Sequence, residues 1–287
     1  MTAVNDTVHT VPTDVGSLRV RVTGRGPVAV LWHSLFVDSR SWYRVEAALA
    51  SQRTLVLIDG PSHGGSQPAR QLFTLENCAA AAGQILGQLG VTGPADWVGS
   101  AWGGHVGMVL AAGQPQRIRS LVTLASPVHA LAARERLRIV PLVGLYRLLG
   151  PVRFLRAAVA DALLTPAVRA GLPGAAELVT DTLRHADRRG FYLTMRSAML
   201  GRPDLSGLLS RITAPTMLVT GGDDPMWTAA SASAAAGCLA HGQAVTIPGS
   251  RHMPALEAPD ELTSLITRFW AAAGSDVTPP PPRAEGS

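Results

Sequence analysis

Short apolar runs alternate with longer helical patterns along most of this 287-residue chain. The runs that we predict to be strands are 18–23, 28–32, 54–58, 97–98, 120–124, 217–220 and 244–247. The helical patterns between them are 41–50, 75–89, 103–112, 229–239 and 259–272. Because parallel strands need a crossover connection, which is usually a helix, this alternation predicts an α/β fold. We expect a mostly parallel sheet flanked by helices, with ligands bound at the carboxyl ends of its strands.

The alternation breaks over residues 127–205, an Ala-, Leu- and Arg-rich block without strand-like runs. We expect this block to be a helical cap over one end of the sheet, with residues 1–126 and 206–273 forming the core. Residues 274–287 include four consecutive prolines and are expected to form a disordered tail. Large side chains of the cap would either pack among themselves or roof a small-molecule pocket: Tyr146, Phe154, Phe191, Tyr192 and Met195.

Five of the seven predicted strands end in a short polar or glycine-containing motif. The segments are 31–35, 59–66, 98–105, 221–225 and 248–254. In order and spacing they resemble the α/β-hydrolase family, specifically its capped, lactonase-like and esterase-like members, and the resemblance covers about residues 15–273. It implies an α/β-hydrolase fold with a helical cap insertion, and a hydrolase acting on a small apolar ester, lactone or other carbonyl compound.

The nucleophile elbow of that family needs small residues two positions before and after the nucleophile, since the turn is tight. Gly99 and Gly103 provide them, which places Ala101 at the nucleophile position. Ser100 is the alternative nucleophile, but its flanks in that register are Val98 and Trp102, which are large. We therefore expect Ser100 to lie beside the elbow with its side chain pointing elsewhere.

The other parts of the resemblance are present. Asp224 matches the family's acid and His252 its catalytic histidine, in the expected order after Ala101, while Asp223 is the runner-up to Asp224. The backbone N–H groups of Leu35 and Trp102 would form the oxyanion hole. We place His33, Phe36 and Trp227 at the substrate pocket, with a structural role in the loop as the alternative for His33; His63 and His105 are expected to be structural.

An alanine cannot attack a carbonyl, so three explanations for Ala101 stay open. It could replace a serine by engineering. It could be natural, with His252 and Asp224 activating water, or abstracting a substrate proton in a lyase, a cyclase or cofactor-free oxygen chemistry. It could also belong to a protein that binds a ligand without turnover. The intact acid, histidine and oxyanion turn favour an enzyme.

Composition excludes several other classes. All 25 basic residues are arginine, so Schiff-base lysines and a P-loop lysine are absent. The pI of about 10.2 follows from arginine chemistry, because the formal charge is only +5 and no nucleic-acid motif is present. Residues 127–205 hold the surplus, with 12 Arg against 6 acidic residues; we expect solvated helix faces, and the alternative is a lid that attracts a carboxylate or other anion.

The remaining expectations concern location and partners. Cys78 and Cys238 are too few for a disulfide framework, and residues 1–10 lack a signal peptide, so we expect a cytoplasmic protein. No run of 18 apolar residues predicts a membrane span. The histidines lie on separate loops without metal-ligand spacing, so we expect no metal and no cofactor. The expected partner is a small-molecule substrate, and the sequence leaves open whether the chain forms a homo-oligomer.

Overall fold

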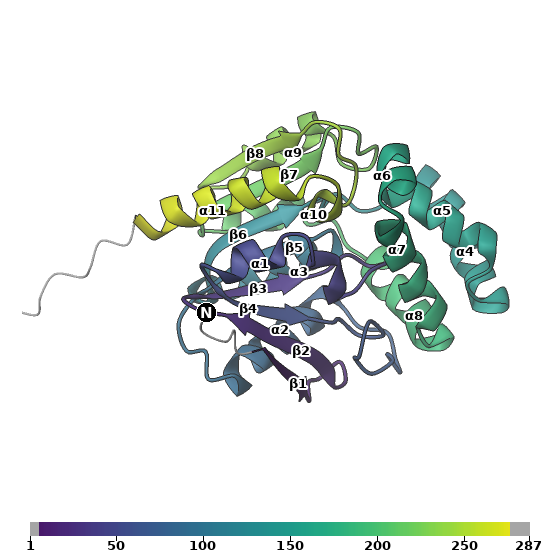
Figure 1. Ribbon diagram of the computed structural model, residues 1–287, viewed down its shortest axis with the longest axis horizontal. Coiled ribbons are helices and arrows are strands. Elements are labelled where there is room, and N and C mark those ends of the chain that lie inside the picture. Colours follow the sequence, from purple (N-terminus) through teal and green to yellow (C-terminus); the bar gives the residue numbers. More distant parts are fainter. Residues whose placement is uncertain (1–5, 276–287) are drawn as a thin grey trace, which may run out of the picture.

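The computed structural model describes residues 6–275, in which eight strands form one sheet (Figure 1). The strand order is β1-β2-β4-β3-β5-β6-β7-β8. The first two pairings, β1 with β2 and β2 with β4, are antiparallel, and all the others are parallel. This confirms the predicted α/β fold with a mostly parallel sheet. The strands are β1 Thr7–Val11, β2 Leu18–Gly24, β3 Val28–Trp32, β4 Thr54–Ile58, β5 Ala95–Ser100, β6 Ile118–Leu124, β7 Thr216–Gly221 and β8 Gly242–Ile247.

Helices cover both faces of the sheet, because successive side chains of each central strand point to opposite sides. In β3, Val30 and Trp32 belong to a core shared with α2, α3 and α9, whereas Ala29 and Leu31 belong to a second core shared with α1 and α11. The central strands therefore read as continuous apolar runs. The flanking helices are α1 Glu46–Ala50, α2 Leu75–Gln88, α3 Trp102–Gly113, α9 Ala229–Ala236 and α11 Pro259–Ser275.

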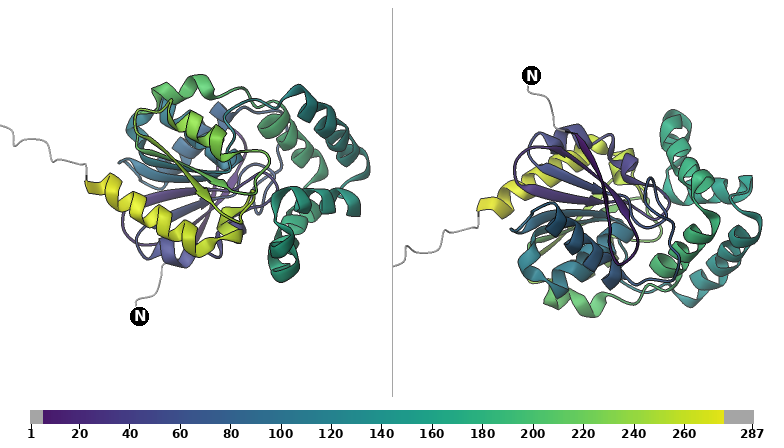
Figure 2. Two further views of the ribbon diagram at one scale, coloured as in Figure 1. Left: turned by 90° about the horizontal axis from the view of Figure 1, so that it is seen from above. Right: turned by 90° about the horizontal axis from the view of Figure 1, so that it is seen from below.

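Five further helices, here called the cap helices, stand together at one side of the sheet (Figures 1 and 2). They follow β6 and precede β7 in the chain, and the loops after β3 and β5 face them across a cavity. These helices therefore cover the carboxyl ends of the strands, which is where sheets of this kind bind ligands. The cap helices are α4 Ala133–Leu149, α5 Arg153–Leu163, α6 Pro166–Gly171, α7 Pro173–His185 and α8 Arg188–Met195.

Three local features differ from the sequence-based expectations. Strand β1 was not expected, because its exposed edge position gives it no apolar pattern. The helix expected over 41–50 is two pieces, since Asp38 accepts the N–H of Arg40 and starts a separate 3-10 turn at Ser39. Residues 274–275 lie in α11 rather than in a tail, and the rest of the predicted tail, 276–287, lies outside the described residues. No helix within 6–275 has the length and apolarity needed to cross a bilayer.

Candidate active site

A strained turn joins β5 to α3, and Ala101 stands at its apex. The residue has φ 46° and ψ −102°, a left-handed conformation that non-glycine residues rarely adopt. A Cβ added to Gly99 would lie 2.2 Å from the carbonyl carbon of Gly103, and one added to Gly103 would lie 2.0 Å from the oxygen of Trp32. Both flanks must therefore be glycine. Ser100 is buried in β5 and is not among the residues that line the adjoining cavity.

His252 and Asp224 form a buried pair on the loops after β8 and β7. The Nδ1 of His252 lies 2.9 Å from Oδ2 of Asp224, and Oδ1 of Asp224 accepts the N–H of Met226 at 2.9 Å. Because a carboxylate only accepts, Nδ1 carries a proton, and Nε2 is the ring nitrogen left to act as a base. That nitrogen has no hydrogen-bond partner among residues 6–275, and His252 lines the same cavity as Ala101. Asp223 is exposed and takes no part.

Glu257 holds the histidine loop from both sides. Its Oε2 accepts the N–H groups of Arg251 at 2.8 Å and of Met253 at 3.2 Å, the two neighbours of His252. Its Oε1 accepts the N–H of Thr165 from the segment between α5 and α6 at 2.8 Å. The N–H of His252 itself bonds to the carbonyl of Leu163, at 3.2 Å. The cap helices and the candidate base are therefore fastened together, an arrangement that sequence reasoning missed because it needs contacts across 90 residues.

The two candidate oxyanion donors, Leu35 and Trp102, both line the cavity. Within residues 6–275, the N–H of Leu35 donates no hydrogen bond. Trp102 is the first residue of α3, so its N–H has no acceptor within the helix, and it donates to no other group of the described chain. The peptide between Ser34 and Leu35 is fixed by His33, whose Nδ1 donates to the carbonyl of Ser34 at 2.7 Å. Since C=O and N–H point in opposite directions in a trans peptide, this bond orients the Leu35 N–H.

His33 was expected at the substrate pocket but does not line the cavity. It is fully buried, its Nε2 accepts the N–H of Gly60 at 2.9 Å, and it is not among the cavity-lining residues. Burial lowers its pKa, so the ring stays neutral as these two bonds require. His63 packs against it with the two rings tilted by 46°, and it faces the carbonyls of Pro61, at 2.8 Å, and Leu35. Burial lowers the pKa of His63 to about 4, so that the neutral ring donates to one of the two.

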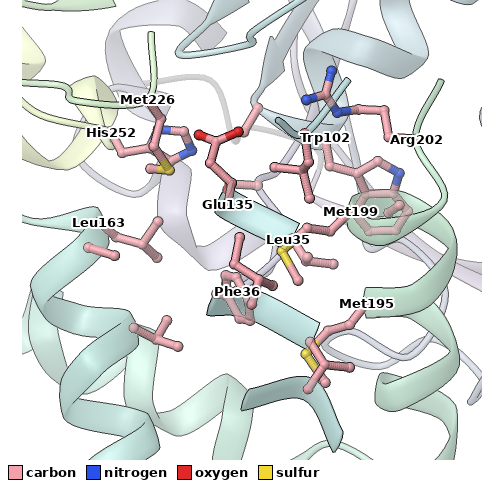
Figure 3. Close-up of a pocket in the computed structure, with 18 of the residues that line it drawn as sticks. Leu35, Phe36, Trp102, Glu135, Leu163, Met195, Met199, Arg202, Met226 and His252 are labelled. Atoms are coloured by element: carbon pink, nitrogen blue, oxygen red, sulfur yellow. The ribbon is translucent and has the colours of Figure 1, made fainter. Parts of the chain in front are cut away.

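The cavity between the sheet and the cap helices has a volume of about 450 Å³ and a largely apolar lining (Figure 3). Phe36 and Trp227 line it, as expected, and so do Tyr146 and Met195 from the cap. The three other cap side chains named from the sequence do not: Phe191 packs on Phe36 and Tyr146, Tyr192 lies beside Arg147 and Arg196, and Phe154 is exposed. Size and lining suit a small, mainly apolar ligand.

Two polar residues of the lining, His105 and Arg202, were not expected there. Both donate to the carbonyl of Pro127, from Nε2 of His105 at 3.0 Å and Nη1 of Arg202 at 2.6 Å. Both side chains are buried, although Arg202 carries a charge. His105 lies one helical turn after Ala101, a spacing that could have marked it from sequence, whereas Arg202 gave no local signal.

The chain is similar to known proteins over most of its length. A model of the alpha/beta hydrolase family matches residues 29–265. A pimeloyl-[acyl-carrier protein] methyl ester esterase from Xanthomonas campestris pv. campestris is 30% identical over 266 residues, covering 89% of this chain and 99% of the relative. A protein of the same name from Stenotrophomonas maltophilia is 28% identical over 285 residues, covering 88% and 96%.

Solved structures share the fold. The enol-lactonase from Burkholderia xenovorans superposes with a TM-score of 0.84 at 21% identity, covering 92% of this chain and 100% of its own. A thermophilic esterase from Thermogutta terrifontis gives a TM-score of 0.83 at 22% identity, covering 94% and 99%. With a family match over most of its length and a relative at 30% identity, the chain belongs to the alpha/beta hydrolase family and is a hydrolase of that superfamily.

Proposed function

We propose that this hydrolase cleaves a small, largely apolar ester or lactone by direct attack of water. His252 is the general base, Asp224 orients it, and the N–H groups of Leu35 and Trp102 bind the negative charge that develops on the carbonyl oxygen. The observation that carries the proposal is the free Nε2 of His252, held by the 2.9 Å bond to Asp224, in a cavity where the nucleophile position is a methyl group.

Ala101 has no hydroxyl group, which changes the proposed mechanism but leaves the proposed roles of the other candidate residues the same. No acyl-enzyme can form, so a water molecule beside the Ala101 methyl would give its proton to Nε2 and its oxygen to the carbonyl carbon. The tetrahedral intermediate then expels the alcohol oxygen, which takes the proton back from Nε2. Serine hydrolases that lose the nucleophile keep only about a thousand-fold advantage over water, so we expect slow turnover unless the water is well positioned.

The substrate class rests on the cavity and on the relatives. An apolar lining around one carbonyl-binding corner suits an acyl chain of a few carbons. The relatives at 28–30% identity are named as esterases of a methyl ester, which makes a methyl or similarly small alkyl ester the first compound to assay. For location, we retain the cytoplasm, supported by two cysteines that are both free.

The test is hydrolysis of short-chain methyl and p-nitrophenyl esters and of γ- and δ-lactones in ¹⁸O-labelled water. We expect one labelled oxygen in the acid product and a loss of at least about 100-fold in kcat/KM for His252→Ala, because the base is removed. The matched control is His241→Gln, an exposed histidine, which should retain full activity. Full turnover in His252→Ala would overturn the proposal.

Two other outcomes are informative. A product without labelled oxygen would assign the dyad to a lyase or cyclase reaction instead. Saturable binding with no product in either variant would identify a ligand-binding homologue.

A further inference from the structure

A positive charge is buried in the wall of the cavity. Arg202 is 8% exposed and follows the cap helices in the chain, and its side chain lines the same space as Ala101 and His252. Figure 3 shows Arg202 and His252 at one end of the cavity, and Phe36 and Met195 at the other. Arginine stays protonated at neutral pH even where burial lowers its pKa, as it does here. A buried charge is costly without a partner of opposite sign.

No carboxylate of the described chain forms an ion pair with Arg202. The two nearest in electrostatic terms are Asp204 and Glu135. Asp204 pairs with His129 at 3.4 Å and bonds to Ser206, and Glu135 accepts the N–H of Ala132 at 2.8 Å. One donor of the guanidinium is used by the carbonyl of Pro127, which leaves its other donors without a protein acceptor.

His105, the polar side chain that shares an acceptor with Arg202, does not supply a negative charge. His105 donates Nε2–H to the same carbonyl of Pro127, and its Nδ1 has no partner among residues 6–275. Burial, with the charge of Arg202 as a second cause, lowers the pKa of His105 well below its ordinary value, so the ring is neutral. The lining also includes Glu135 and Arg138, which are exposed and of opposite sign, so it keeps one net positive charge, with Arg202 as its buried member, beside the candidate catalytic dyad.

We propose that Arg202 binds a carboxylate of the substrate, so that the preferred substrate is a monoanion: a half-ester of a dicarboxylic acid, or a lactone that bears a carboxylate. A planar guanidinium with free donors matches a carboxylate, and a single charge matches a monoanion better than a phosphate dianion. This inference rests on the proposed function, since it specifies the substrate of that same site.

Binding tests the inference without turnover. Adipate, its monomethyl ester and its dimethyl ester are titrated by calorimetry into the wild-type protein, Arg202→Gln and Arg134→Gln. Arg134 is an exposed arginine of α4, so its variant has the same change in net charge. We expect the half-ester to bind the wild type at least about 30-fold more tightly than the diester. Arg202→Gln should lose that preference and Arg134→Gln should keep it.

Three results would overturn the inference: equal binding of half-ester and diester to the wild type, an unchanged preference in Arg202→Gln, or tighter binding of butyl phosphate than of the half-ester. Thermal melts verify that Arg202→Gln is folded, and Arg202→Lys, which keeps the charge, should restore part of the preference. Kinetics separate the two proposals. Hydrolysis of the diester at a rate equal to that of the half-ester would refute the carboxylate site alone, whereas half-ester binding without hydrolysis would refute the hydrolase mechanism alone.

Discussion

At the scale of single residues, the candidate site has the tight turn, the histidine and the acid of a serine hydrolase, but an alanine at the nucleophile position. Ala101 keeps the left-handed φ of 46° that a nucleophile at this turn adopts, although an alanine gains nothing from the strain. His252 and Asp224 are joined by the hydrogen bond that the proposed base and its orienting acid require. In the proposed mechanism, a hydroxyl group at position 101 is the part of a serine hydrolase site that this chain lacks.

The prediction at this scale concerns a hydroxyl group introduced at position 101. We expect Ala101→Ser to become labelled by a fluorophosphonate and to gain ester hydrolysis of at least about 100-fold, because His252 is already placed to take the serine proton. Labelling is measured by intact-protein mass spectrometry. The double variant Ala101→Ser/His252→Ala is the control and should remain unlabelled. Absence of labelling in a folded Ala101→Ser would mean that the histidine does not serve this position.

At the scale of elements, the loops that carry the candidate residues are fixed by contacts from distant parts of the chain. The elbow depends on α3 lying against β5 so closely that Gly99 and Gly103 cannot carry a Cβ. The histidine loop depends on Glu257, which accepts hydrogen bonds from both neighbours of His252 and from Thr165 beside the cap helices. Glu257 is thus a positioning residue, because it acts on the base through the backbone.

Glu257→Gln tests this role. Both carboxylate oxygens of Glu257 accept hydrogen bonds from backbone N–H groups. In glutamine one of these oxygens is replaced by an NH₂ group, which cannot accept, so the hydrogen bonds to that oxygen are lost. We expect kcat to fall about 10-fold with little change in KM, and the free energy of unfolding to fall by about 2 kcal/mol. Glu261→Gln, at an exposed position in the first turn of α11, is the control. A rise in KM at constant kcat would assign Glu257 to substrate binding instead.

At the scale of the whole molecule, buried neutral histidines link stability to pH. His33 and His63 join the loops after β3 and β4, and burial lowers the pKa of both, for His63 to about 4. The unfolded chain binds protons at these residues below about pH 6.5, whereas the folded chain does so only near or below pH 4 for His63. Stability is therefore full above pH 6.5 and is lost as the pH falls.

Urea unfolding at pH 7.5, 6.5, 5.5 and 5.0 measures this linkage. We expect the free energy of unfolding to fall by about 2 kcal/mol or more across that range, since each depressed histidine contributes up to about 1.4 kcal/mol per pH unit. The His241→Gln variant, changed at an exposed site, should show the same slope. A flat profile between pH 7.5 and 5.0 would show that the pKa values of these rings are the same in the folded and the unfolded chain.

The sequence by itself determined the fold class and the order of the motifs. Period and length of apolar runs decide whether a segment is strand or helix, and glycine at 99 and 103 identifies the elbow, because these are local properties of the chain. The edge strand β1 could not be predicted, since its pairing with β2 rather than its own composition makes it a strand.

Only the tertiary structure decided which side chains reach the cavity. It removed His33 from the pocket wall, because both ring nitrogens bond to backbone in the loops behind it. It brought Glu257 to the histidine loop, and it placed the charge of Arg202 in an apolar wall without a carboxylate partner in the described chain. Burial and pairing depend on segments that are distant in sequence, so a charge that is ordinary in the sequence becomes a candidate specificity group only once the chain has folded around it.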